Sequence, residues 1–554
     1  MQFDSATSAA GYLAEALLRA LSAMDKLESL MGVRVRLSQG LFCSGFASWR
    51  DSDQRDLHTG SVTNKTSDKT PSGEIDDHGA DHHTTVRSRG GVFIALGSNV
   101  GDRLEAIEAA CRAIDDDEDM QVIQTSSLYE TEPMYVEDQA RFLNGVCEIE
   151  TQLQPLELLD RLQTLEKGLG RVKTIDKGPR SIDLDILLYK TQTHHDDRLT
   201  IPHALMTERE FVLRPLRDIK SDRLIPHTEA SSGSSTTTEL PITRDENPTM
   251  FPYTPLADSC QPLTAVNPRR KTRVMSILNT TPDSFSDGGA NSPADTEALR
   301  TTILSHIRAG ATVIDIGGQS SRPNAPDISA DEELARVLPA IEVITSLGAD
   351  AAGIAISIDT YRAAVAEAAI KAGAHIINDI SFGTMDPDML ATVAKLGCAY
   401  IGMHMRGTPT TMQDAENCSY PSGVIPTIAH ELTARVAAAQ AAGIRRWRLV
   451  LDPGIGFAKT GAQNIKVLRD LKQLTSGVDF PGLRGLPWLV GSSRKGFIGA
   501  VTGVAEAGDR VWGTAATVAM AVAGGADVVR VHDVAEMSQV VKMSDAVYRE
   551  AGVS

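Results

Sequence analysis

The sequence is poor in aromatic residues and in positive charge. Phe, Trp and Tyr make up 5% of its 554 residues, and acidic residues outnumber basic ones by 72 to 54, for a formal net charge of −18. Nucleic-acid-binding proteins usually present a basic surface and aromatic stacking platforms. The composition therefore disfavours a DNA- or RNA-binding function, and local clusters of Lys and Arg should hold any anionic ligand.

Cysteines are few, and long apolar runs are missing. The six cysteines are widely spread and form no C-x-x-C pair, which disfavours a disulfide framework and indicates a reducing compartment. No apolar run reaches the length of about 18 residues that a membrane span needs. Residues 1–24 lack the pattern of a secretory signal, and Asp4 and Glu15 are unusual in a transit peptide. We expect a cytoplasmic protein, with mitochondrial import as the alternative.

Two stretches contain few core-forming residues. Residues 51–90 are rich in Asp, His, Thr, Ser and Gly, and residues 227–262 combine a Ser/Thr run with scattered prolines. Both compositions are typical of linkers. They separate three blocks, which are residues 1–50, 91–226 and 263–554. The first block offers one helix and one strand, too little for an independent domain, so we expect an N-terminal extension.

The middle block alternates strands and helices in the order β-α-β-β-α-β, which is typical of a ferredoxin-like α+β fold. The expected strands are 91–96, 121–130, 142–150 and 182–189, and the expected helices are 102–114 and 155–169. The third block differs, because eight continuous apolar runs alternate with Ala-rich helical stretches. The runs are 273–279, 312–318, 353–359, 375–380, 400–405, 448–452, 488–492 and 527–533. This size and rhythm predict a (β/α)8 TIM barrel, with a doubly wound sheet as the alternative.

Polar residues follow the expected barrel strands, where catalytic groups of such barrels project. They include Asn279, Gln319 to Arg322, Asp359, Asn378, His404, Asp452, Ser493 to Lys495, Arg530 and His532. The acidic and amide side chains suit the donor-rich edge of a heterocycle. The cationic side chains suit a polyanion such as diphosphate.

The motifs of the third block resemble those of dihydropteroate synthase, a TIM-barrel enzyme that joins a pterin diphosphate to p-aminobenzoate. Residues 278–289 read LNTTPDSFSDGG, residues 403–407 read MHMRG, residues 452–459 read DPGIGFAK and residues 493–495 read SRK. The resemblance implies that Asn279 orders Mg2+ and the diphosphate. It implies pterin contacts from Asp359, Asn378, Asp452 and Lys495, a diphosphate anchor at Ser493, Arg530 and His532, and a p-aminobenzoate loop that includes Ser321 and Arg322. Ser321 stands where many members have Thr, and Gln319 where many have Glu. Sulfonamides, which resemble p-aminobenzoate, should compete at this site.

The middle block contains a carboxylate pair. Asp183 and Asp185 stand two residues apart on an expected strand, so both leave the same face while Leu184 points to the core. Such a pair suits Mg2+ that carries nucleotide phosphates. The turn at residues 97–101 lacks the G-K-[ST] of a Walker loop, which excludes a P-loop kinase.

Residues 92–216 resemble 6-hydroxymethyl-7,8-dihydropterin pyrophosphokinase. The motifs are ALGSNVGDR at residues 95–103 and GPRSIDLDIL at residues 178–187. The resemblance implies two Mg2+ ions that bridge ATP to Asp183 and Asp185. The implied pterin contacts are Thr131, Phe142, Asn144 and Phe211, and the implied ATP contacts are Glu166, Arg171, Arg180, Arg198, His203 and Arg209. Lys177 stands where some members have a Trp.

The order of the two blocks resembles the bifunctional folate-synthesis proteins of eukaryotes, in which fungal members carry dihydroneopterin aldolase units upstream. Residues 1–50 are therefore interpreted as a possible remnant of such a unit, without its activity. The expected function is ATP-dependent pyrophosphorylation of the pterin, then condensation with p-aminobenzoate. The alternatives are a pterin-binding methyltransferase barrel, or one half that acts as a non-catalytic scaffold. Small molecules are the expected partners, and assembly into a homo-oligomer through the barrel is left open.

Overall fold

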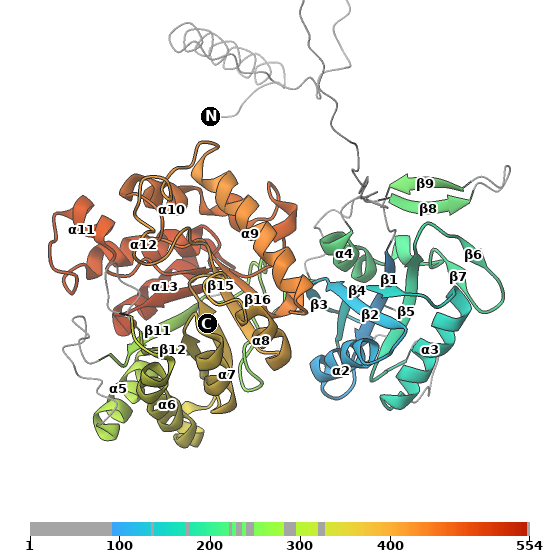
Figure 1. The fold of residues 1–554 in the computed structure, drawn as a ribbon, viewed down its shortest axis with the longest axis horizontal. Coiled ribbons are helices and arrows are strands. Elements are labelled where there is room, and N and C mark those ends of the chain that lie inside the picture. The colour runs from blue at the N-terminus through green and yellow to red at the C-terminus, as the bar shows by residue number, and fades with distance from the viewer. Residues whose placement is uncertain are drawn as a thin grey trace, which may run out of the picture. The chain divides into compact units, whose positions relative to one another are not determined.

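The computed structural model describes residues 91–134, 138–171, 178–220, 224–228, 235–239, 249–281, 295–319 and 327–550. Their strands and helices form two assemblies around separate sheets (Figure 1), both within one compact unit. Among the described helices, none is both long and apolar enough to cross a membrane. The expected extension and linker at residues 1–90 lie outside the described residues.

The first assembly is a sheet buried on both faces. Its order is β10-β3-β4-β1-β5, with β2 also paired to β4. Along β1, Val92 and Ile94 pack with helices α2 and α3, whereas Phe93 packs with α4 on the other face. The elements are β1 (Val92–Ser98), α2 (Arg103–Asp115), β2 (Met120–Thr125), β3 (Leu128–Thr131), β4 (Phe142–Thr151), α3 (Pro155–Gly168), β5 (Asp183–Tyr189), α4 (Glu210–Ile219) and β10 (Phe251–Tyr253). The α+β prediction is confirmed.

One predicted strand of this sheet is divided in two. The expected strand at residues 121–130 is interrupted at Ser126, whose Oγ donates to the carbonyl of Ser127 at 2.6 Å. Short pairs β6 (His194–His195) with β7 (Thr200–Ile201) and β8 (Leu224–Thr228) with β9 (Ser235–Glu239) form separate hairpins, and the 3-10 turn Met206–Glu208 precedes α4. These pieces leave the order of the main elements unchanged.

The second assembly is a parallel sheet of eight strands in the order β16-β15-β14-β13-β12-β11-β18-β17. A parallel bridge between Leu451 on β16 and Trp488, next to β17, joins its two ends. The strands are β11 (Arg273–Asn279), β12 (Val313–Gly317), β13 (Ala355–Asp359), β14 (Ile376–Asp379), β15 (Ala399–Met403), β16 (Leu449–Asp452), β17 (Leu489–Val490) and β18 (Val528–Val531). The TIM-barrel prediction is therefore confirmed, and the doubly wound alternative is wrong.

Helices surround this barrel, as Figure 1 shows for α5 to α13. The inner ring of side chains, which includes Met275, Val313 and Ile376, is apolar, and a larger apolar layer lies between the strands and the helices. The helices are α5 (Thr296–Ala309), α6 (Ala330–Ser346), α7 (Ala363–Lys371), α8 (Met389–Leu396), α9 (Val424–Ala441), α10 (Gly461–Thr475), α11 (Gly496–Thr502), α12 (Val511–Ala523) and α13 (Val534–Tyr548). The 3-10 turns are Gly348–Ala351, Arg446–Arg448 and Pro481–Leu483.

The last part of the expected linker at residues 227–262 is packed structure. Strand β10 pairs antiparallel with β3, and Leu256 is buried in the core inside the barrel together with Leu263. The segment packs on the first sheet through β10 and on the barrel core through Leu256. The Ser/Thr-rich composition further upstream gave no indication of this packing. Residues 229–234 and 240–248 lie outside the described residues.

The barrel contributes a side chain to the core of the first sheet. Trp447, in the turn before β16, is fully buried among residues of α2 and β2. Its Nε1 donates to Oε1 of Glu108 at 2.8 Å, and Arg448 Nε donates to the same oxygen at 3.0 Å. Arg445 forms an ion pair of 2.6 Å with Asp115. The two assemblies thus share a buried polar and apolar contact.

Candidate functional site

The carboxylate pair of the first sheet lies where the sequence predicts it. Asp183 and Asp185 project from the same face of β5, and Leu184 between them is buried on the other face. A Cβ atom on Gly97, which pairs with Asp183, would lie 3.3 Å from Oδ1 of Asn144 and 3.8 Å from Cβ of Asp183. Glycine therefore keeps the strip beside the carboxylates open.

Two arginines hold Asp183. Nη2 of Arg171 lies 2.7 Å from its Oδ1, and Arg180 pairs with its Oδ2. Burial raises the pKa of Asp183, and the negative charge of Asp185 adds to this effect, while the two arginines oppose it. Glu166 lies behind the pair and accepts from the backbone N–H of Leu184 at 2.8 Å. A site that concentrates negative charge in this way attracts cations.

These side chains line a cavity of about 240 Å³. Within it, Nδ2 of Asn144 donates to Oγ1 of Thr131 at 2.7 Å, and the Arg180 guanidinium lies 5.6 Å from the ring centroid of Phe142. The predicted residues in its lining are Thr131, Phe142, Asn144, Arg171, Arg180, Asp183, Asp185, His203, Arg209 and Phe211. Burial lowers the pKa of His203, and the nearby charge of Arg209 lowers it further. The cavity therefore combines an aromatic and amide region with a charged region.

Other residues depart from the expectation. Arg198 is outside the cavity lining and forms an exposed ion pair with Asp160. Asn99 was missed, although it stands in the quoted motif: its Oδ1 accepts from the backbone N–H of Arg180 at 2.8 Å, and its Nδ2 donates to Gln139 at 3.1 Å. Asn99 thus connects the first motif with the second.

The C-terminal end of the barrel is organised around Arg530 on β18. Its Nε lies 2.6 Å from Oδ2 of Asp315, and its Nη2 lies 2.6 Å from Oδ2 of Asp359. Asn378 donates to the same oxygen of Asp315 at 3.0 Å. Burial raises the pKa of Asp359 to about 7, although Arg530 opposes the shift. Asp315 was missed because it lies within an apolar strand, with no motif around it.

Asp452 and Lys495 complete this cluster. Asp452 accepts from the backbone N–H of Gly454 at 2.7 Å, and burial raises its pKa to about 6. Burial also lowers the pKa of Lys495 to about 8, with Arg530 next in effect. Nζ of Lys495 lies 4.2 Å from the ring centroid of Phe457, a cation–π distance. Asp452 and Lys495 are both shielded from water, so each would bind strongly to a ligand group of opposite charge.

Three more predicted residues lie at the same end. Oγ of Ser493 is 3.0 Å from Nδ1 of His532. A Cβ atom on Gly317 would lie 3.6 Å from Oδ1 of Asn279 and 3.7 Å from Cβ of Asp359. Gly317 therefore lies between these two residues, and each of them is close to its backbone. Ser321 and Arg322 lie outside the described residues.

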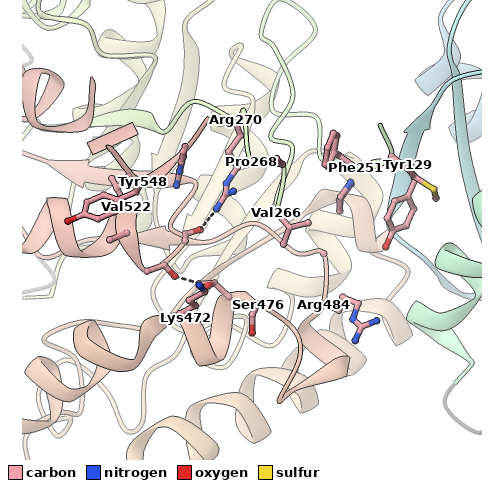
Figure 2. A pocket seen from close by; sticks show the side chains of 18 of the residues that line it. Tyr129, Phe251, Val266, Pro268, Arg270, Lys472, Ser476, Arg484, Val522 and Tyr548 are labelled. Carbon is pink, nitrogen blue, oxygen red and sulfur yellow. Dashed lines mark hydrogen bonds between the residues drawn. The ribbon is translucent and has the colours of Figure 1, made fainter. Parts of the chain in front are cut away.

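A larger cavity, of about 580 Å³, lies at the other end of the barrel strands (Figure 2). It is lined where helices α10, α12 and α13 end, and two arginines and a threonine there donate to backbone carbonyls. Arg270 donates to the carbonyl of Gly525 at 3.2 Å, Arg549 donates to that of Ala526, and Thr475 donates to that of Gly524 at 2.7 Å. Cations at helix C-termini complement the helix dipole. Arg270 and Arg549 therefore have a structural role at this end of the barrel.

The comparisons with known proteins agree with this geometry. Residues 93–221 match the family model of 7,8-dihydro-6-hydroxymethylpterin-pyrophosphokinase, and residues 275–532 match that of pterin binding enzymes. Among the described residues, no group of three or more His, Cys, Asp or Glu side chains could hold a metal ion.

Similar proteins span both assemblies. The chain is 45% identical over 459 residues to the folic acid synthesis protein fol1 of Pneumocystis carinii, a match that covers 83% of this chain and 60% of that protein. The chain thus spans about 60% of the length of this relative. The crystal structure of Plasmodium falciparum HPPK-DHPS wild type with pteroate matches with a TM-score of 0.64 at 21% identity, over 83% of this chain and 97% of that one, which supports the fold alone.

A plant protein is matched over nearly its whole length. The mitochondrial folate synthesis bifunctional protein of Pisum sativum is 40% identical over 473 residues, which cover 83% of this chain and 90% of that protein. Because two family models and this extended identity coincide, the chain belongs to the family of bifunctional folate synthesis proteins.

Proposed function

We propose that the chain catalyses two consecutive reactions of folate synthesis. In the first, the hydroxyl oxygen of 6-hydroxymethyl-7,8-dihydropterin attacks the β-phosphorus of ATP and loses its proton to water, the bond to the α-phosphate oxygen breaks, and AMP leaves. In the second, the amino nitrogen of p-aminobenzoate attacks the pterin methylene carbon. The carbon–oxygen bond breaks, diphosphate leaves, the nitrogen loses a proton to diphosphate or water, and 7,8-dihydropteroate forms.

The first reaction is assigned to the cavity beside β5. The amide and aromatic region of the cavity would hold the pterin. This region consists of Thr131, Asn144 and the rings of Phe142 and Phe211. Arg171, Arg180, His203 and Arg209 would hold the phosphates of ATP, with Glu166 fixing Arg171 and Arg198 contributing only if it leaves Asp160. Phosphoryl-type transfer depends mainly on positioning and on charge neutralisation. The arrangement of these side chains supports both.

Asp183 and Asp185 fit Mg2+ chemically. Mg2+ is usually bound through one or two carboxylates together with substrate phosphates, and Asp183 already forms ion pairs with the cationic side chains of Arg171 and Arg180. When bound, the ions would neutralise the phosphate charge that develops in the transfer. We propose two ions at this pair. In the barrel, the amide oxygen of Asn279 offers a single ligand for a third ion beside the diphosphate.

The second reaction is assigned to the C-terminal end of the barrel. Asp359, Asn378 and Asp452 would accept and donate along the pterin edge. Lys495, Arg530, His532 and Ser493 would hold the diphosphate, and they would stabilise the negative charge that it gains as the carbon–oxygen bond breaks. Ser321 and Arg322 are proposed to contact p-aminobenzoate. The observation that carries the whole proposal is that a carboxylate cavity and this cationic strand-end cluster occur in one chain.

A coupled assay tests the proposal. The purified chain receives ATP, hydroxymethyl-dihydropterin and p-aminobenzoate, and both AMP and dihydropteroate are measured with Mg2+ and with EDTA. We expect equal amounts of the two products with Mg2+ and little AMP with EDTA. A second reaction with ready-made pterin diphosphate reports the barrel alone. Absence of AMP in the first mixture, or of dihydropteroate in the second, would make the corresponding half a scaffold.

Two further proposals concern assembly and location. We propose that a second copy of the chain covers an exposed apolar patch on α12 and α13, where Trp512, Met520 and Met543 are 83%, 44% and 65% exposed. Sedimentation of wild type and Trp512→Glu tests this, because a dimer should dissociate in the variant. We propose a cytoplasmic location, with mitochondria as the alternative that the name of the pea relative suggests. Imaging of the tagged chain distinguishes the two.

A further inference from the structure

Lys459 is a fully enclosed lysine next to the barrel cluster. It belongs to the loop at residues 453–460, between β16 and α10, and only 2% of its surface is exposed. Its Nζ lies 3.0 Å from each of three atoms, namely the carbonyl oxygens of Gly454 and Phe457 and Nδ1 of His404. An ammonium group has three donors and no acceptor. All three hydrogens of Lys459 are therefore used inside the protein.

The contacts of Lys459 continue to the surface in one hydrogen-bonded chain. Because Nδ1 of His404 accepts from Lys459, the ring proton must stand on Nε2, which lies 2.8 Å from Oε2 of Glu431. Glu431 in turn accepts from Nε of Arg406 at 3.0 Å. Burial lowers the pKa of His404 to about 4, in agreement with a neutral ring. The order of donors along the chain is thus fixed from Lys459 to Arg406.

The two carbonyls that Lys459 holds belong to residues that touch the proposed pterin pocket. Gly454 gives its N–H to the carboxylate of Asp452. Phe457 presents its ring to Nζ of Lys495. Gly454 has φ +70°, and a Cβ atom there would lie 2.0 Å from the carbonyl oxygen of His404. The loop therefore passes close to the end of the neighbouring strand β15. Lys459 therefore fixes the two points of the loop that orient Asp452 and Lys495.

In the described part of the chain, other side chains hold the loop at different points. Asn464 Oδ1 accepts from the N–H of Gly456 at 2.7 Å, and the hydroxyl of Tyr420 donates to the carbonyl of Ala458 at 2.8 Å. Without Lys459, the buried carbonyl of Phe457 would lose the hydrogen bond from the ammonium group, and the carbonyl of Gly454 would keep only the one from the backbone N–H of Phe457, at 3.1 Å. Leaving such groups unsatisfied is costly, so the loop would be expected to shift toward water.

We propose that Lys459 is a positioning residue of the barrel site, which presets Asp452 and Lys495 for the pterin diphosphate. The inference rests on the proposed synthase function. It needs no contact between Lys459 and substrate, since the side chain lies behind the loop. Its effect should appear in the affinity for the pterin diphosphate and not in that for p-aminobenzoate.

The test is the kinetics of Lys459→Met, which keeps length and removes the three donors. With ready-made pterin diphosphate, we expect its KM to rise at least tenfold while the KM for p-aminobenzoate stays within twofold. Lys466→Met, on the exposed side of α10, is the matched control and should equal wild type. A lower kcat with both KM values unchanged would indicate a loss of folded protein and would overturn the proposal.

A double variant shows whether Lys459 acts through Asp452. In an Asp452→Asn background, Lys459→Met should add less than threefold to the KM, whereas independent effects would multiply and contradict the proposal. If Lys459→Met does not fold, Glu431→Gln tests the other end of the chain and should raise the same KM by a smaller factor. Failure of the proposed function is distinguishable, because wild type would then form no dihydropteroate.

Discussion

The indole N–H of Trp447, which precedes a barrel strand, donates to the carboxylate of Glu108, on a helix of the antiparallel sheet. The two residues are 339 positions apart in the chain. Trp447 is fully buried, and Glu108 also accepts from Arg448. The contact makes one half of the chain part of the packing of the other, although their proposed active sites are separate.

Trp447→Ala should destabilise the pyrophosphokinase half. Removing a fully buried tryptophan costs about 3–5 kcal/mol, and here it also leaves the carboxylate of Glu108 without one donor. We expect AMP formation to be lost at a lower urea concentration than in wild type, as measured by activity after incubation. Val478→Ala, at an exposed site, should leave the urea midpoint of AMP formation unchanged. Equal midpoints for both variants would contradict the structural role.

Asp185→Asn should separate the two reactions. Asn is nearly isosteric, and its neighbours Leu184 and Ile186 remain buried. The change removes one negative charge from a site proposed to hold divalent cations, so AMP production should fall by at least two orders of magnitude. Dihydropteroate should form at the wild-type rate from ready-made pterin diphosphate. Asp119→Asn, an exposed control, should retain both rates, and loss of both rates in folded Asp185→Asn would refute two separate sites.

Asp452 should make the ligand-free barrel less stable as the pH rises. Its pKa is raised from 3.8 to about 6 by burial, so its stabilising contribution is full below about pH 4 and is lost as the pH passes 6. Asp452→Asn cannot ionise and keeps an acceptor for Gly454. At pH 8 it should exceed wild type by on the order of 2–3 kcal/mol.

This difference is measured by thermal unfolding without ligand between pH 4 and pH 8. The gap between Asp452→Asn and wild type should close toward pH 4. Asp350→Asn, on the exposed surface, serves as the control and should show a constant offset. A gap for Asp452→Asn that does not vary with pH would show that the carboxyl group ionises as easily in the folded chain as in the unfolded one.

Arg530 should be required for stability as well as for the diphosphate. Arg530→Ala leaves the fully buried carboxylate of Asp315 without its cation, a change that typically costs about 3–5 kcal/mol. Because Asp359 also loses its partner, affinity for the plain hydroxymethyl pterin should fall too. Adding Asp315→Asn to Arg530→Ala should restore part of the stability in urea unfolding. Full stability of the single variant would show that the ion pairs contribute nothing.

The sequence was most informative where chemistry and periodicity coincide. The strand ends that carry Asp359, Asn378 and Asp452 follow continuous apolar runs, so both the barrel and the positions of these residues could be predicted. Asp183 and Asp185 were equally clear, because a two-residue spacing on a strand fixes their common face. The roles assigned to these residues remain predictions.

Residues whose importance depends on distant parts of the chain could not be predicted in this way. Asp315 sits inside an apolar strand, and only its neighbours across the barrel, Arg530 and Asn378, reveal its function in the packing. Trp447 gave no signal of its contact with Glu108. Lys459 stood in a quoted motif, yet its three acceptors come from backbone geometry that a sequence does not display.

The position of Trp447 has a consequence for synthesis on the ribosome. Residue 447 is made 228 residues after Ile219, the end of α4. At about 5–20 residues per second, the N-terminal half waits roughly 10–45 s for that side chain. During this interval the core that contains Ile107 and Ile114 lacks the indole ring of Trp447, which belongs to the same core. A chaperone that shields apolar surface would have its main task in this window, before translation supplies the missing tryptophan.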